Sequence, residues 1–235
     1  MSRWSAGPAA GDAPGAAAPD ATAGDAGHNP RMTAPITVER LSPGRRADFL
    51  RFFDHERGPA FADNPEWAKC YCHFYHVPRE IAWSSLTAED NRAAMGARID
   101  AGEMEGFLAY ADGEVVGWLN AQPRHKLPHA CARLDVAPPE LPVPAHEAAA
   151  IVCFVIAPGW RRRGVARALL DAALASFAAR GIRVVDAYPF KAGPDAGAAD
   201  HYHGPPSLFH AAGFAVVDDG ESVTVMRRVL APPAR

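Results

Sequence analysis

The chain has 235 residues, a formal net charge of −3 and a hydrophobic content of 49%, values that suit one globular domain with its own core. A charge so close to zero argues against a general nucleic-acid-binding surface, and no apolar run is long enough to span a membrane. The N-terminus shows no secretory pattern, so we expect a cytoplasmic protein whose four cysteines are free thiols.

Residues 1–34 consist mainly of Ala, Gly, Pro and Asp and show no periodic apolar face. Such a composition buries too little surface to offset the entropy that a chain loses on ordering. The sequence therefore predicts a flexible tail over residues 1–34 and a single domain over residues 35–231.

Strand and helix patterns begin after this tail. Apolar residues recur at helical spacing over residues 48–56, and Thr87 with Asp90 forms a capping box that begins a second helix. The Asp112-Gly113 pair between two apolar runs is typical of a tight β-hairpin. The first half therefore predicts a strand at 36–41, helices at 48–56 and 87–101, and hairpin strands at 107–110 and 115–120.

A Pro-rich connection, residues 122–145, leads into the second half and either lines a substrate pocket or forms an exposed excursion. The apolar run at 149–156 is typical of a strand buried on both faces, and a helix follows between Gly164 and Gly181. The remaining pattern predicts strands at 184–188, 214–217 and 223–229 and a short helix at 207–212. The resulting order, β-α-α-β-β-β-α-β-α-β-β, indicates an α/β (α+β) fold.

The residues between the apolar strand and its helix carry an Arg-x-x-Gly-x-Ala arrangement made of Arg161, Gly164 and Ala166. The first turn of a helix has unpaired N–H groups and the positive end of the helix dipole, which together attract anions. Gly164 and Ala166 leave room for a phosphate to approach the backbone. This arginine turn (residues 161–167) therefore predicts a pyrophosphate site, to which three further arginines add positive charge: Arg162, Arg163 and Arg167.

The sequence around the arginine turn resembles the signature of the GCN5-related N-acetyltransferases (the GNAT family). A strand, Pro158, the Arg-x-x-Gly-x-Ala arrangement and a helix follow one another as in that family, and an Ala-Gly-Phe element closes a later helix at residues 212–214. The resemblance extends over roughly residues 36–230. It implies a GNAT fold, with a central mixed, mostly antiparallel sheet flanked by helices, and acetyl-CoA as co-substrate.

The resemblance also implies which residues bind acetyl-CoA. The backbone at the end of the apolar strand would pair with the pantetheine arm, and the amides of the arginine turn would hold the pyrophosphate. The implied cofactor-binding residues are Phe154, Val155, Ile156, Arg161, Arg162, Arg163, Gly164, Val165, Ala166, Arg167 and Phe209.

The implied reaction, attack of an amine on the acetyl thioester, needs an acid that protonates the leaving thiolate. Many relatives carry a Tyr shortly before the Gly-Phe element, and this chain has Phe209 there, which keeps the ring without the hydroxyl. We therefore predict Tyr202 as the acid, with His203, Ser207, His210 or water as alternatives.

The reaction also needs a base that keeps the attacking amine neutral. The position at which some relatives carry a Glu base falls near Ala150, which cannot accept a proton. The sequence therefore predicts the upstream Glu147 as the base, with Asp135, His146 or ordered water as alternatives.

Residues 67–76 read Trp-Ala-Lys-Cys-Tyr-Cys-His-Phe-Tyr-His and are similar to a Cys-x-Cys segment in a bacterial subgroup of these enzymes. Three interpretations stay open: aromatic packing, a wall of the acceptor pocket, and a zinc site, although Cys-x-Cys spacing is tighter than usual for zinc. No metal is expected. The predicted acceptor-binding residues are Trp67, Cys72, His73 and Tyr188.

These observations predict an acetyl-CoA-dependent N-acetyltransferase that transfers the acetyl group to a primary amine of a small molecule or a peptide. Two alternatives stay open: a non-catalytic acyl-CoA-binding sensor, because the usual Tyr and Glu are missing, and a metal-binding protein that uses residues 70–76. A homodimer is a possible assembly, and neither nucleic acid nor a membrane is an expected partner. The acceptor and the preferred acyl chain stay open.

Overall fold

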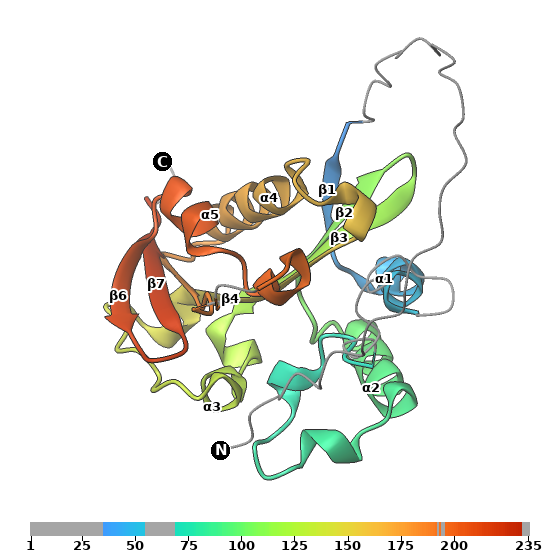
Figure 1. The fold of residues 1–235 in the computed structure, drawn as a ribbon, viewed down its shortest axis with the longest axis horizontal. Coiled ribbons are helices and arrows are strands. Elements are labelled where there is room, and N and C mark those ends of the chain that lie inside the picture. The colour runs from blue at the N-terminus through green and yellow to red at the C-terminus, as the bar shows by residue number, and fades with distance from the viewer. Residues whose placement is uncertain (1–34, 55–68, 192, 194–195, 232–235) are drawn as a thin grey trace, which may run out of the picture. The chain divides into compact units, whose positions relative to one another are not determined.

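The computed structural model describes residues 35–54, 69–191, 193 and 196–231, all within a unit that begins at Ala34 (Figure 1). The predicted tail over residues 1–34 lies outside the described residues. No helix in the described part of the chain combines the length and the apolar character that a membrane span requires.

Within the described residues, seven strands form one mixed sheet in the order β1-β2-β3-β4-β5-β7-β6. The neighbours β4 and β5 are parallel, and every other neighbouring pair is antiparallel, which is the mostly antiparallel sheet expected for this fold. The strands are β1 (Thr37–Arg40), β2 (Phe107–Ala111), β3 (Glu114–Pro123), β4 (Ala148–Ile156), β5 (Val184–Ala187), β6 (Ala215–Asp219) and β7 (Thr224–Val229).

Helices cover both faces of the sheet (Figure 1). Successive residues of a strand point to opposite faces, so Trp118 and Leu119 of β3 belong to two different cores. In the described structure, the core that contains Trp118 includes residues of three helices, and the core that contains Leu119 includes residues of two others. The helices on the Trp118 face are α1 (Arg46–Phe53), α2 (Ala88–Asp100) and α3 (Ala130–Leu134), and those on the Leu119 face are α4 (Val165–Ala179) and α5 (Pro206–Ala211).

The local signals in the sequence position these elements well. The capping box is confirmed, because Thr87 Oγ1 accepts the Asp90 N–H at 3.1 Å and the Asp90 carboxylate accepts the Thr87 N–H at 2.9 Å. The hairpin turn is also confirmed, with φ angles of 52° at Asp112 and 79° at Gly113. The predicted order is wrong in one respect, since it omits the short helix α3 within the Pro-rich connection.

Gly117 of β3 allows the helix that follows the arginine turn to pack closely against the sheet. A Cβ at residue 117 would lie 2.7 Å from Val165 Cγ1 and 3.2 Å from Leu169 Cδ1, both on α4. We expect Gly117→Ala to lower the free energy of unfolding by about 1–3 kcal/mol in urea denaturation, because the packed core must shift. Gly44→Ala is the control, since its Cβ would meet nothing nearer than 3.9 Å, and an equal loss in both variants would contradict this account.

Candidate active site

The arginine turn leads from the end of β4 to the start of α4. Gly164 is the residue before the helix, and its φ of 83° lies in the left-handed region that glycine adopts without strain. Among the residues that the structure describes, no side-chain hydrogen bond caps the start of α4, and a Cβ built on Gly164 meets no atom within 4 Å. The backbone at this helix start is therefore accessible to an anion.

The arginines of the turn differ in their contacts. Arg161 is half-buried and its Nε donates to the Ile156 carbonyl at 3.1 Å, which ties the turn to the end of β4. Arg162 and Arg163 are exposed, and the Arg163 guanidinium lies 5.4 Å from the centre of the Trp160 ring. Two cationic groups on the surface beside an uncapped helix start produce a positive local potential.

Arg167 points along α4 rather than back across the turn. Its guanidinium pairs with the Asp171 carboxylate at 2.8 Å, one helical turn further on, and also reaches the Ala211 carbonyl at 3.4 Å. Its charge is therefore partly balanced within the protein. Val165 is buried and Ala166 half-buried, so these two contribute to an anion site through their backbone amides.

The strand β4 separates from β5 just before it reaches the arginine turn. The register between β4 and β5 ends at Ile151 and Ala187. The pairing of β4 with β3 shifts at Val152, because Asn120 faces Cys153 while its neighbour Ala121 faces Ile151. An extra residue of this kind bends a strand away from its partner, and here it leaves one edge of residues 153–156 unpaired with β5.

A loop before α5 contacts this edge. The Phe154 N–H donates to the Tyr202 carbonyl, so the amide that we expect to bind the pantetheine arm already has a partner in this structure. The Phe154 side chain is buried on the α4 and α5 face, where its ring centre lies 6.0 Å from that of Phe209. Phe209 is fully buried, so it supports this strand through packing.

Aromatic rings surround the end of the same loop. His203 is 2% exposed, its ring centre lies 3.9 Å from that of Phe190 and 4.4 Å from that of Tyr202, and its Nε2 is hydrogen-bonded to the Tyr75 hydroxyl at 3.1 Å. Its Nδ1 has no hydrogen-bond partner among the described residues. Burial lowers the pKa of His203 to about 3 and raises the pKa of Tyr202. The imidazole is therefore neutral and the phenol protonated at neutral pH.

Glu147 lies at the other end of β4 from the arginine turn. Its carboxylate accepts a hydrogen bond from Arg183 at 3.1 Å and lies 3.8 Å from His146. The predicted role of Glu147 as the base stays a prediction.

The described acceptor candidates each contact a different partner. Cys72 is 1% exposed and its sulfur accepts a hydrogen bond from Asn120 at 3.2 Å, whereas the His73 ring is hydrogen-bonded to Asn91 at 2.8 Å. Tyr188 is 1% exposed, with its hydroxyl 3.9 Å from Cys131 Sγ. Trp67 lies outside the described residues. Their roles in acceptor binding stay predictions.

Residues 70–76 do not form a metal site with other described residues. Among the described residues, no group of three or more His, Cys, Asp or Glu side chains is placed to hold a metal ion. Cys72, His73 and His76 each have a different amide partner, namely Asn120, Asn91 and Gln122. The structure therefore does not favour the metal-binding interpretation of residues 70–76.

Two features of this region carried no usable signal in the sequence. The contact between Tyr75 and His203 joins residues 128 positions apart, and nothing in either local pattern indicates it. Cys153 lies within an apolar run, where the sequence does not distinguish its thiol from any other buried side chain.

Comparison with known proteins agrees with the geometry of the turn and the sheet. Residues 72–202, more than half of the chain, match the model of the Acetyltransferase (GNAT) family. No curated protein sequence matches.

Several solved structures are similar to this chain at low sequence identity. A GNAT-family acetyltransferase from Streptococcus pneumoniae is 15% identical, with 84% of this chain and 100% of that chain covered and a TM-score of 0.46. An acetyltransferase from Thermus thermophilus is 21% identical, with 85% and 100% covered and a TM-score of 0.47. The PaiA N-acetyltransferase from Thermoplasma acidophilum, solved with coenzyme A, is 13% identical, with 83% and 99% covered and a TM-score of 0.48.

The family match covers β3, β4, the arginine turn, α4 and β5, which are the elements that build the candidate site. The chain therefore belongs to the acetyltransferase (GNAT) family.

Proposed function

We propose that this protein transfers the acetyl group of acetyl-CoA to the primary amine of a small molecule or a peptide. Its family uses acetyl-CoA, which supplies an activated thioester when bound. The observation that carries the proposal is the uncapped start of α4 at Gly164, with open space where a Cβ would stand and the exposed Arg162 and Arg163 beside it.

The residues of the turn fit a pyrophosphate. The N–H groups at the start of α4 have no side-chain cap, and a helix N-terminus favours a negative charge. Arg162 and Arg163 supply charge from the surface, while Arg161 holds the turn to β4 through the Ile156 carbonyl. These residues would bind and orient the nucleotide end of the cofactor.

The edge of β4 after the bulge suits the pantetheine arm, which we propose extends the sheet along residues 154–156. Because the Phe154 N–H donates to the Tyr202 carbonyl, the arm must take over this hydrogen bond or use the amides that follow. The first case couples cofactor binding to a movement of the Tyr202 loop. That loop also contains the proposed acid, so the same movement would reposition it.

Tyr202 is the proposed donor of the proton that the leaving thiolate needs. Its backbone contacts Phe154, and burial raises its pKa, so the hydroxyl stays protonated at neutral pH. Glu147 is the proposed base and, because it lies at the far end of β4, would act through ordered water. We propose that Trp67, Cys72, His73 and Tyr188 line the acceptor side.

We expect Tyr202→Phe to lower kcat by about 100-fold while the affinity for acetyl-CoA changes little, because only the proton donor is removed. Tyr110→Phe is the matched control, since it removes a hydroxyl bonded to Asp48 at 2.9 Å on the α1 side. Steady-state kinetics with the best acceptor measure both variants. Equal kcat values for Tyr202→Phe and wild type would mean that a group other than Tyr202 protonates the leaving thiolate.

The proposed function is tested by following release of free coenzyme A thiol from acetyl-CoA in the presence of a panel of amines. We expect thiol release that depends on the amine and an acetylated product of matching mass. Tight binding of acetyl-CoA without turnover across small amines and peptide N-termini would instead favour a non-catalytic sensor.

A further inference from the structure

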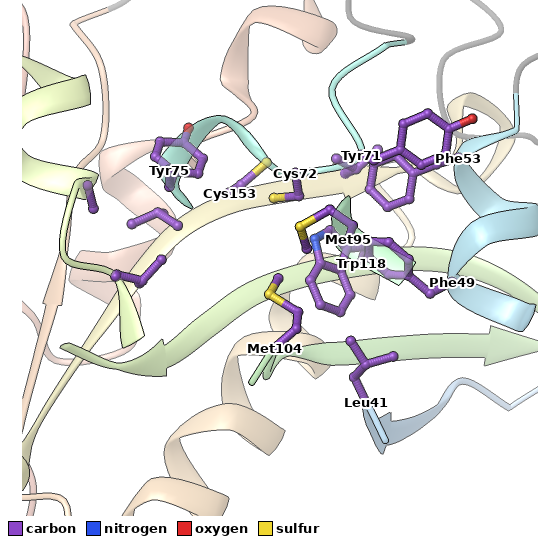
Figure 2. Close-up of a cluster of buried hydrophobic side chains, with 14 of the residues drawn as sticks. Leu41, Phe49, Phe53, Tyr71, Cys72, Tyr75, Met95, Met104, Trp118 and Cys153 are labelled. Carbon is purple, nitrogen blue, oxygen red and sulfur yellow. The ribbon is translucent and has the colours of Figure 1, made fainter. Parts of the chain in front are cut away.

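Two buried thiols face each other on the α1 and α2 side of the sheet. Cys72 is 1% exposed and Cys153 is 6% exposed, and both belong to the same cluster of buried side chains. Figure 2 shows them next to each other above Trp118 and Met95. They come from distant parts of the chain, Cys72 from the Cys-x-Cys segment and Cys153 from β4.

The sheet register explains why these thiols meet. Asn120 of β3 and Cys153 of β4 are direct partners across the two strands, so their side chains share one face. The Asn120 side-chain amide donates to the Cys72 sulfur at 3.2 Å. Cys72 is therefore hydrogen-bonded to Asn120, the residue that pairs with Cys153 across the two strands, and lies against Cys153 itself.

The backbone of the Cys-x-Cys segment adopts an uncommon conformation that turns Cys72 inward. Tyr71 has a φ of 44° and Cys72 a φ of 57°, two successive non-glycine residues in the left-handed region. Each costs free energy that other contacts must offset. The Tyr71 hydroxyl donates to Asp54 at 2.9 Å, and the His73 N–H donates to the Cys70 carbonyl at 2.8 Å. Such strain concentrates at functional positions.

The three thiols of this region differ chemically. Burial raises the pKa of Cys72, but contact with Cys153 and the hydrogen bond from Asn120 outweigh burial and lower this pKa. The pKa of Cys153 is raised by its contact with Cys72 and by burial. Burial raises the pKa of Cys70 to about 12. The surroundings therefore favour the thiolate of Cys72 over that of Cys153, and both thiols are buried.

We propose that Cys72 and Cys153 are a redox-active dithiol that a two-electron oxidant, such as a peroxide or an azodicarboxamide, converts to an intramolecular disulfide. The bond ties the turn at Tyr71 and Cys72 to β4, one residue before Phe154. It thus joins the Cys-x-Cys segment to the strand edge assigned to the cofactor arm.

The reaction balances with an azodicarboxamide (diamide) as oxidant. The Cys72 sulfur adds to one nitrogen of the N=N bond, and the other nitrogen takes up a proton. The Cys153 sulfur then attacks the Cys72 sulfur, the S–N bond breaks, and the released nitrogen takes the second proton. The two thiols lose two electrons, and the N=N bond is reduced to a hydrazine.

The test treats the full-length reduced protein with diamide, unfolds it in the presence of a thiol-alkylating reagent and maps the peptides by mass spectrometry. We expect the number of alkylated cysteines to fall from four to two and the disulfide to join the peptides of Cys72 and Cys153. Dithiothreitol should restore all four. This measurement needs no variant, so it does not depend on how a substitution affects folding.

Variants identify the pair independently. Cys131→Ser, which removes the thiol near Tyr188, should still lose two alkylation sites on oxidation. In Cys153→Ser, whose folding is checked by its thermal transition, we expect Cys72 to form no disulfide on oxidation. Full alkylation of the oxidised wild type, or a disulfide that joins Cys70 to Cys72, would overturn the proposal. Either result is independent of whether the protein binds acetyl-CoA.

Discussion

Gly164→Glu is expected to weaken the binding of acetyl-CoA at least about 100-fold, because it places a carboxylate where the pyrophosphate must approach the backbone. Two unit charges about 4 Å apart near a protein surface repel by roughly 4 kcal/mol. A Cβ at residue 164 meets no described atom within 4 Å, so the added side chain finds open space rather than a clash within the protein. Isothermal titration calorimetry with acetyl-CoA measures the loss.

The matched control is Gly164→Gln. Both substitutions force a side chain onto a residue with a φ of 83°, and both add nearly the same volume, so they share the backbone strain. The difference between them reports the charge alone. Affinities for acetyl-CoA that fall equally in the two variants would indicate a steric or folding effect and would contradict an anion site at this turn.

Asp186→Asn is expected to lower the free energy of unfolding by about 3–5 kcal/mol, because it removes the only carboxylate that balances two part-buried guanidinium groups within the described structure. The Asp186 carboxylate is fully buried and accepts hydrogen bonds from Arg227 at 2.6 and 3.1 Å and from Arg124 at 3.3 Å. Asp186 and Arg227 are direct partners between β5 and β7. Urea denaturation measures the change.

The control for Asp186→Asn is Glu39→Gln, which makes the same chemical change in an exposed pair. Glu39 bonds Arg45 at 2.8 Å, but both side chains contact solvent, so we expect a loss below about 1 kcal/mol. Similar losses in the two variants would mean that burial adds nothing to the ion pair of Asp186. That outcome would contradict the account of how β5 and β7 are held together.

The sequence predicts the arginine turn well because every signal for it is local. An apolar run, Pro158, Gly164 and the apolar spacing of the next helix lie within a single stretch, and each has a direct conformational meaning. The capping box at Thr87 and the turn at Asp112 are predicted for the same reason.

Contacts between distant residues could not be predicted in this way. The pairing of Asp186 with Arg227 depends on the sheet register, which strand patterns alone do not determine. The hydrogen bond of Tyr75 with His203 and the contact of Cys72 with Cys153 (Figure 2) involve residues outside the strands, and their loops have no pattern that predicts these partners. The helix α3 was missed because five residues in a Pro-rich stretch show too little periodicity.

The path of the loop that contains Tyr202, at the candidate site itself, could not be predicted from the sequence either. The sequence indicates a Gly- and Pro-rich loop without a fixed path, so its contact with the edge of β4 at Phe154 could not be anticipated. This contact changes the proposal for the cofactor arm, because the arm would either compete with the Tyr202 carbonyl for the Phe154 amide or use the amides that follow.

The most direct test of the central claim, that the turn at Gly164 binds acetyl-CoA, is a calorimetric titration of the folded full-length wild-type protein with acetyl-CoA. The account predicts saturable binding to one site per chain, weakened strongly in Gly164→Glu and far less in Gly164→Gln. A folded wild-type protein that gives no binding heat, and whose thermal midpoint does not change with acetyl-CoA, would contradict it.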